Sequence, residues 1–139
     1  MKSSQRRRPP RAVSERMKAV KSRGNASTEL KMRRVLQREG ITGWRRHTPI
    51  TGTPDFCWKR ERVALFVDGC FWHGCPRCKK IPKNYGSYWP GRIAKNKKHD
   101  AVVTRTLRSE DWRVVRVWEC RVTTIGTISR LRRALGRRR

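Results

Sequence analysis

One short segment in the middle of the chain, residues 68–78, concentrates the residues that most constrain the fold. Its cysteines, Cys70, Cys75 and Cys78, have the spacing C-x4-C-x2-C, and Cys120 follows at the end of an apolar run. Four thiolates with this clustering suit a closed, tetrahedral zinc site. A fold that uses this site has to bring the segment and Cys120 together, so we expect two neighbouring strands to lead into it.

Two other interpretations of the cysteines remain. The same spacing with a distant fourth cysteine is typical of plant-type iron–sulfur proteins. However, the loop carries the bulky residues Phe71, Trp72 and His73, and the chain is extremely basic, and an electron carrier needs neither feature. Four unrelated buried cysteines are the third interpretation, which the clustering disfavours. Zinc is therefore preferred, and Cys57, outside the pattern, is expected to fill space in the core.

The charge balance indicates a polyanionic partner. Lys and Arg number 37 against 10 Asp and Glu, which gives a formal net charge of +27 over 139 residues. Nucleic acid is the first candidate, because basic side chains that contact phosphates release counterions. A membrane surface is disfavoured, because we find no broadly amphipathic basic helix, no lipidation signal, no transmembrane run and no signal-peptide core.

The chain is expected to form one domain between basic ends. Residues 1–13 are expected to be a disordered basic arm, residues 14–136 a single domain, and residues 137–139 a basic tail. Within the domain, a short helix is predicted at residues 14–20. A longer helix is predicted from a cap at Asn25 or Ser27 to a stop at Gly40.

The remaining hydrophobic pattern predicts an α/β fold. In the longer helix, Leu30, Val35 and Leu36 are expected to face the core, with Met32 at the edge. Strands are predicted at residues 44–48, 55–58, 62–68 and 112–118, a loop at 82–90, and helices at 93–109 and 124–135. This order of helix, three strands, helix and strand (αβββαβ) predicts a mixed central sheet flanked by helices.

A set of acids and one histidine suggests hydrolytic chemistry. Asp55 opens one predicted strand and Asp68 ends the next, so adjacent strands would bring them together. Paired acids at strand ends can hold magnesium against a scissile phosphate. His73 could deprotonate a water molecule, and Glu29 on the longer helix could reach the same place. The alternative is a non-catalytic zinc-knuckle protein that binds and bends DNA, which would have no need for this set.

Two adjacent aromatic residues could enter a base stack. Phe71 and Trp72 cannot both be buried easily inside a tight metal loop. An apolar wedge costs a few kcal/mol of unstacking per step, and the cost is lower at a mismatch. The alternative for Trp72 is packing against the metal loop.

Four sequence motifs together resemble one family. They are Pro54-Asp55-Phe56, the run from Val67 to Cys78, Tyr88-Trp89 with Asn96 and Asp100, and the run from Asp111 to Cys120. They are similar to the very short patch repair (Vsr) endonucleases, over about residues 14–122, and to the wider PD-(D/E)xK nuclease fold.

The resemblance implies an enzyme that nicks one strand at T:G mismatches left by deamination of 5-methylcytosine. It implies catalytic magnesium and structural zinc. It also implies a cytoplasmic, nucleoid-associated bacterial monomer that works with mismatch-repair factors and a cytosine-5 methyltransferase.

The resemblance also implies residue roles. Asp55 would bind magnesium with the backbone carbonyl of Val67, Glu29 matches the family's helix acid, and His73 would be the catalytic base. Phe71 and Trp72 would wedge into the base stack, and Trp89 would intercalate from the opposite groove. The zinc ligands would be Cys70, Cys75, Cys78 and Cys120.

The chain departs from the best-studied family member at four places, one of which is the loop before the third zinc ligand, where that protein is one residue shorter. Asp68 and Cys75 each stand where that protein has histidine. Asp68 could therefore bind magnesium directly or orient His73. After Trp89, Pro90-Gly91 is predicted to interrupt the helix that family members continue.

Overall fold

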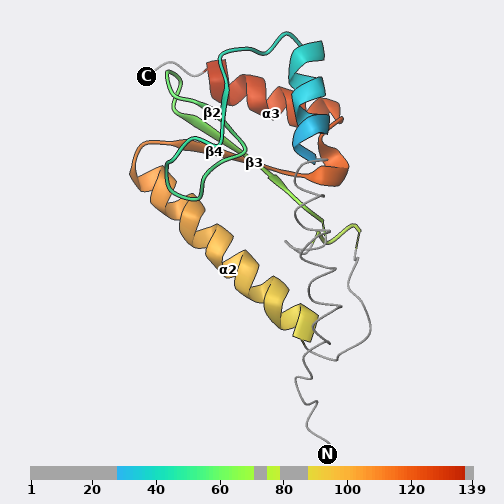
Figure 1. The fold of residues 1–139 in the computed structure, drawn as a ribbon. Helices are drawn as coiled ribbons and strands as arrows, with labels where there is room; N and C mark the ends of the chain where they lie inside the picture. Colours follow the sequence, from blue (N-terminus) through green and yellow to red (C-terminus); the bar gives the residue numbers. More distant parts are fainter. Residues whose placement is uncertain (1–27, 71–74, 79–87, 137–139) are drawn as a thin grey trace, which may run out of the picture.

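The computed structural model describes residues 28–70, 75–78 and 88–136 (Figure 1). A first helix covers residues 28–38. The later elements are β1 (Arg45–Arg46), β2 (Phe56–Trp58), β3 (Val63–Asp68), α2 (Tyr88–Ser109), β4 (Arg113–Trp118), the 3-10 helix η1 (Glu119–Arg121) and α3 (Ile125–Gly136). The predicted order of helix, three strands, helix, strand and final helix is confirmed within these ranges.

The four strands form one mixed sheet in the order β1-β2-β3-β4. The first two pairings are antiparallel, and β3 and β4 run parallel. Every residue of β3 is buried, as expected for a strand whose two faces are both covered. The parallel pair is joined through α2, which is the crossover that such a pair requires.

Helices cover the two faces of this sheet. On one face, Val63, Leu65 and Val67 of β3 pack with the first helix and α3 in one apolar cluster. On the other, Ala64 and Phe66 pack with residues of α2 in a second cluster. The alternation follows from the two-residue period of a strand. Figure 1 shows α3 and the first helix on one side of the sheet, and α2 on the other.

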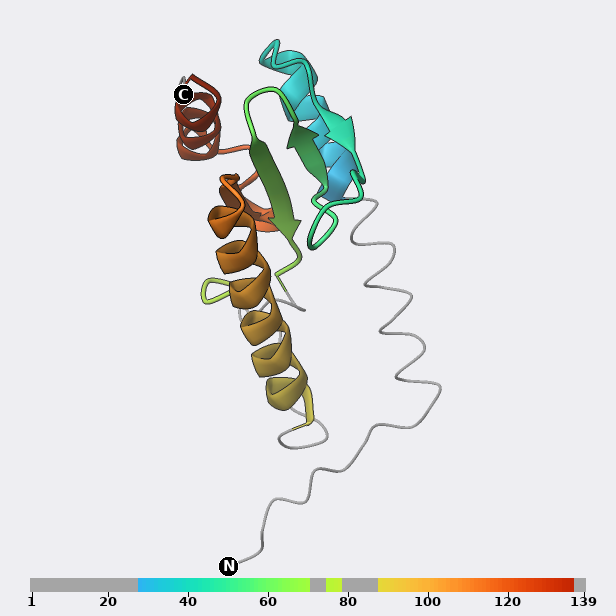
Figure 2. The ribbon, with the colours of Figure 1, turned by 90° about the vertical axis from the view of Figure 1, so that its left-hand side faces the viewer.

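The start of α2 corrects the sequence prediction. We expected a loop to residue 90 and an interruption of the helix at Pro90-Gly91, but α2 begins at Tyr88 and contains both residues. Proline is tolerated in the first turn because the amide groups there have no partner within the helix. The N-terminal half of α2 extends past the end of the sheet in both ribbon views (Figures 1 and 2).

The buried face of the first helix also differs from the prediction. Met32 is fully buried with Val35 and Leu36, whereas Leu30 is 47% exposed. The buried stripe of this helix consists of residues 28, 29, 32, 35 and 36. It includes the polar residues Thr28 and Glu29, and at helical spacing Leu30 lies outside it. The predicted stop is confirmed, because Gly40 has a φ of 67°, the left-handed conformation common after helices.

Several predictions fall on residues outside the described ranges. These are the basic arm, the short helix at 14–20, the cap at Asn25 or Ser27, and the basic tail. Among the residues that are described, no helix is both long and apolar enough to cross a membrane.

Candidate active site and metal centre

The candidate active site lies where β3 outruns its pairing with β2. The last antiparallel pair joins Phe56 to Leu65, so the end of β3 has no strand partner on that side. Asp55, just before β2, takes this place. Its Oδ2 accepts a hydrogen bond of 2.7 Å from the backbone N–H of Val67. The antiparallel arrangement therefore puts the carboxylate beside the end of the buried strand, as the sequence predicted.

Glu29 of the first helix joins this carboxylate. Its side chain is buried, and it is held by the guanidinium of Arg46 and by Nε2 of His47, which lies 3.2 Å from Glu29 Oε2. Burial raises the pKa of Asp55. The Val67 hydrogen bond opposes this effect, and a hydrogen bond to Glu29 with the charges of Glu29 and Asp68 adds to it, so that the pKa is about 7.

The raised pKa has a chemical consequence. Two neighbouring carboxyl groups in a partly buried site repel when both are ionised, so the folded protein retains a proton there near neutral pH. A bound cation would remove that repulsion and release the proton. The arrangement of Asp55 and Glu29 is thus suited to a hard, oxygen-seeking cation.

Asp68 lies near Asp55 but is turned toward α2. Its Oδ1 is 2.9 Å from Nη1 of Arg116 on β4. The same guanidinium donates a hydrogen bond of 2.8 Å to Oγ1 of Thr104 and lies 3.8 Å from Oδ1 of Asp100. Its Cζ also lies 4.3 Å from the centre of the Phe66 ring. Asp68 is therefore neutralised by a fixed arginine.

Asp55 and Asp68 line one hollow of about 190 Å³. It is also lined by His99, Asp100 and Arg116, to which the sequence assigned no role. Arg116 did leave a signal, because it is a charged residue within the apolar run of β4. The parallel register pairs Arg116 with Phe66. Phe66 lies two residues before Asp68, and therefore both side chains are on the same face of the sheet. We find no comparable signal for His99, or for Arg46 and His47 beside Glu29.

A glycine lets the wall of this hollow close. Gly52 has a φ of 76°, and a Cβ there would lie 2.3 Å from Cγ1 of Val103 on α2. Any side chain at this position would force the turn before Asp55 away from the helix.

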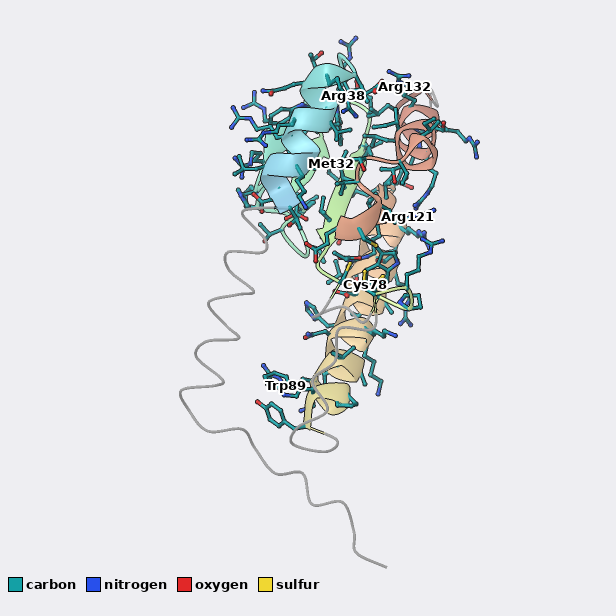
Figure 3. All side chains as sticks on the ribbon, turned by 90° about the vertical axis from the view of Figure 1, so that its right-hand side faces the viewer. Met32, Arg38, Cys78, Trp89, Arg121 and Arg132 are labelled. Atoms are coloured by element: carbon teal, nitrogen blue, oxygen red, sulfur yellow. The ribbon has the colours of Figure 1, made fainter. Side chains whose placement is uncertain are left out.

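The four predicted zinc ligands converge at the other side of the β3 end. The Sγ atoms of Cys70, Cys75, Cys78 and Cys120 all lie within 4.8 Å of one another, and those of Cys75 and Cys120 are 3.8 Å apart. The parallel register explains the meeting, because Asp68 pairs with Trp118, and residues 70 and 120 each follow two positions later. Figure 3 shows Cys78 near Arg121 of η1.

The spacing fits one tetrahedral ion. Four sulfurs at about 2.3 Å from a central zinc would be about 3.8 Å apart. A multi-iron cluster would spread the four sulfurs more widely, because different irons bind them. Cys57 lies elsewhere, fully buried in the cluster under α2, as predicted.

Backbone groups fix the cysteine loop. The N–H of Cys75 donates to the carbonyl of Cys70 at 2.9 Å, and the N–H of Cys70 donates to Oε1 of Glu119 at 3.1 Å. Burial opposes ionisation of Cys75, but the backbone N–H groups of Cys78 and Arg77 and the neighbouring thiols lower its pKa to about 7. A thiolate is therefore accessible for metal binding at neutral pH.

The structure tests the roles of four other predicted site residues either not at all or only in part. Phe71, Trp72 and His73 lie outside the described residues. Trp89 is 2% exposed and packs edge-on against Tyr88, with ring centres 4.9 Å apart. Its insertion into DNA would require it to leave this position, and its role stays a prediction.

Comparisons with known proteins identify the family to which the chain belongs. Residues 8–80 match the family model described as DNA mismatch endonuclease Vsr. The chain is 36% identical over 122 residues to the type II nicking enzyme V.XorIIP of Xanthomonas oryzae, covering 86% of this chain and 88% of that protein. It is 32% identical over 109 residues to the DNA mismatch endonuclease Vsr of Escherichia coli, covering 77% and 69%. The chain therefore belongs to the Vsr family.

Proposed function

We propose that this protein is a magnesium-dependent endonuclease that nicks one strand of DNA at T:G mismatches. The known relatives support the reaction class, because one is a DNA mismatch endonuclease and others are nicking enzymes. T:G mismatches arise when 5-methylcytosine is deaminated, so a cytosine-5 methyltransferase would create the substrate, and mismatch-repair factors would act on the product.

The observation that carries the proposal is the carboxylate pair at the β3 end. Asp55, just before β2, and Glu29, on the first helix, reach this place from distant parts of the chain. Burial raises the pKa of Asp55 to about 7, and the hydrogen bond and charge of Glu29 add to this effect. A protein that only binds DNA gains nothing from two acids held together beside a phosphate-binding surface. Such a pair lowers the stability of the folded protein when both acids are ionised, and a catalytic cation bound between them would remove this repulsion.

Asp55 and Val67 are the groups proposed to hold magnesium. The N–H of Val67 faces Asp55, and the N–H and C=O of one strand residue face the same neighbour. The Val67 carbonyl is therefore on the Asp55 side, with Glu29 beside it. Bound there, magnesium would polarise the scissile phosphate and stabilise its developing charge. Asp68 is assigned a positioning role, because Arg116 already occupies its Oδ1.

The remaining roles follow from the resemblance. His73 is proposed as the base that takes a proton from the attacking water, and Phe71 and Trp72 as wedges beside the mismatch, with Trp89 as a further wedge. The cysteines are proposed to hold structural zinc. That ion would tie the ends of β3 and β4 together and fix both ends of residues 71–74, which lie between Cys70 and Cys75 in the sequence.

The test is a nicking assay on an end-labelled duplex with one T:G mismatch in a set of flanking contexts. Asp55→Asn is compared with Asp111→Asn, a change at an exposed acid outside the site. We expect a magnesium-dependent nick beside the T, lost by at least a thousandfold in Asp55→Asn and kept in Asp111→Asn. Tight binding with no cleavage by the wild type in any context would favour the architectural DNA-binding protein instead.

A further inference from the structure

The free edge of the sheet forms a groove that the candidate active site does not use. β4 is the last strand of the sheet, and no strand among the described residues pairs with its outer edge. α2 lies on one face of the sheet and α3 on the other, so the outer edge of β4 runs between them. We call this feature the β4 groove. It consists of two adjoining hollows of about 350 and 420 Å³ that share Arg130.

Arginine dominates the lining of the β4 groove. The first hollow adds Arg108, Arg113 and Arg133 to the shared Arg130, and the second adds Arg77, Arg116 and Arg121. None of the residues that line either hollow is acidic. Elsewhere the described acids are used to hold basic groups, as Glu29 holds Arg46 and Glu39 holds Arg132. Arg116 is paired with Asp68, but the lining as a whole is a concentrated positive surface.

Some of these arginines are fixed and others face solvent. Arg113 donates to the carbonyl of Ala134 at 2.6 Å, and Arg130 donates to the carbonyl of Arg116 at 3.2 Å. Arg108, Arg121 and Arg133 are exposed, and no carboxylate in the described part of the chain forms an ion pair with them. Exposed guanidinium groups around a groove are suited to phosphate oxygens, which they contact in a bidentate manner.

We propose that the β4 groove binds the phosphodiester backbone of DNA at a second contact, separate from the cleavage centre. The inference rests on the proposed function only in taking DNA as the ligand. Arg116 lines both the groove and the hollow that contains Asp55. The groove therefore begins where the candidate active site ends, and it would carry the duplex that flanks the cut.

An acidic peptide added as a further strand is the competing occupant. Strand addition needs the backbone groups of the free edge. Arg130 already occupies the Arg116 carbonyl, and the Arg113 side chain reaches across to α3. Arg130 thus takes one of the backbone acceptors of β4 that a peptide would need, whereas the exposed guanidinium groups of the groove remain available to phosphates.

Binding to an uncleaved mismatched duplex tests the proposal, with calcium in place of magnesium. The groove variant is Arg108→Gln/Arg121→Gln/Arg133→Gln. The matched control is Arg33→Gln/Arg34→Gln/Arg60→Gln, which removes equal charge from exposed positions outside the groove. The thermal unfolding temperature of each variant is first compared with that of the wild type, to establish that the variant folds normally. Affinity is measured against salt, and hydroxyl-radical footprints are compared.

Log affinity decreases as log salt concentration increases. We expect the magnitude of this slope to decrease by about 0.9 for each lost phosphate contact, and so by up to about 2.7 in the groove variant. Affinity should fall at least tenfold, with protection lost on one flank of the mismatch only. Equal slopes and footprints in the two variants would overturn the proposal. The proposal would also be overturned if the groove variant bound DNA like the wild type but lost binding to poly-glutamate, because that result would indicate a site for an acidic peptide. If the wild-type protein never nicks DNA, the proposed function is refuted. The comparison of DNA binding between the groove variant and the control variant would still test the β4 groove.

Discussion

Arg116 Nη1 lies 2.9 Å from Asp68 Oδ1, and the two residues come from neighbouring parallel strands of the sheet. Asp68 is 7% exposed, so its charge depends on this partner. The same guanidinium contacts Thr104 and Asp100 of α2. The pair therefore connects the end of β3, where the candidate active site lies, to the helix that closes it.

Loss of Arg116 should destabilise the protein through Asp68. Arg116→Met would remove the cation that faces a nearly buried carboxylate, which should lower the free energy of unfolding by about 2–4 kcal/mol. In Asp68→Asn/Arg116→Met that charge is gone, so the double variant should be more stable than the sum of the single changes by about 1 kcal/mol or more. Urea unfolding of the single and double variants measures this coupling.

Arg105→Met is the matched control, because Arg105 is exposed on α2 and makes no ion pair with a described acid. Its effect should stay within about 0.5 kcal/mol. Additive effects of the Asp68 and Arg116 changes would contradict the prediction, because they would show that the ion pair contributes nothing to stability.

Sequence patterns predicted this fold well where one periodic signal dominated. The apolar run of β3 and the cysteine spacing were sufficient to expect a neighbouring strand that leads to Cys120. The register confirms this neighbour, and it shows that the two strands run parallel. The start of α2 was missed, because Pro90 ends a helix in its interior but is neutral in its first turn. Leu30 was assigned inward by hydrophobicity alone, although buried Thr28 and Glu29 set the actual face.

The candidate site was harder to predict than the fold. Asp55, Asp68 and the cysteines could be found because strand ends and spacing place them. The partners of these groups are set by contacts between distant elements, such as His47 with Glu29 and Arg116 with Asp68. Periodicity within one element carries no information on such pairs, so the ionisation behaviour of the site emerges only from the three-dimensional structure.

Asp55→Asn should stabilise the magnesium-free protein in a pH-dependent way. The folded-state pKa of Asp55 is raised from 3.8 to about 7, so the folded protein binds more protons than the unfolded chain between these values. Its free energy of unfolding therefore falls as pH rises through that window. Removing the group should stabilise the protein by about 2–4 kcal/mol at pH 8 and have little effect near pH 4. Urea unfolding at both pH values is the measurement, and an equal gain at the two would contradict it.

Cys120→Ser should prevent the cysteine cluster from holding the proposed structural zinc. Three thiolates remain, and the exposed fourth position would admit water, so zinc should be lost on dialysis and the thermal unfolding temperature should fall. Cys57→Ala is the control, because Cys57 is buried outside the cluster, and it should keep one zinc per chain. Metal content by mass spectrometry decides. Iron with visible absorption in the wild type would instead indicate an iron–sulfur cluster.

Binding of the catalytic cation should be linked to the proton on the carboxylate pair. Below about pH 7 a cation at Asp55 has to displace that proton, whereas above it the site is already ionised. The affinity for calcium, as an inert substitute for magnesium, should therefore rise about tenfold per pH unit from pH 5.5 to 7 and level off above. Calorimetry in two buffers of different ionisation enthalpy should detect about one proton released at pH 6 and almost none at pH 8. In Arg46→Gln, the carboxylate of Glu29 loses one of its two basic partners and keeps only His47, so the pKa of Asp55 should rise and the levelling-off should move to higher pH. An affinity independent of pH would place the cation away from Asp55.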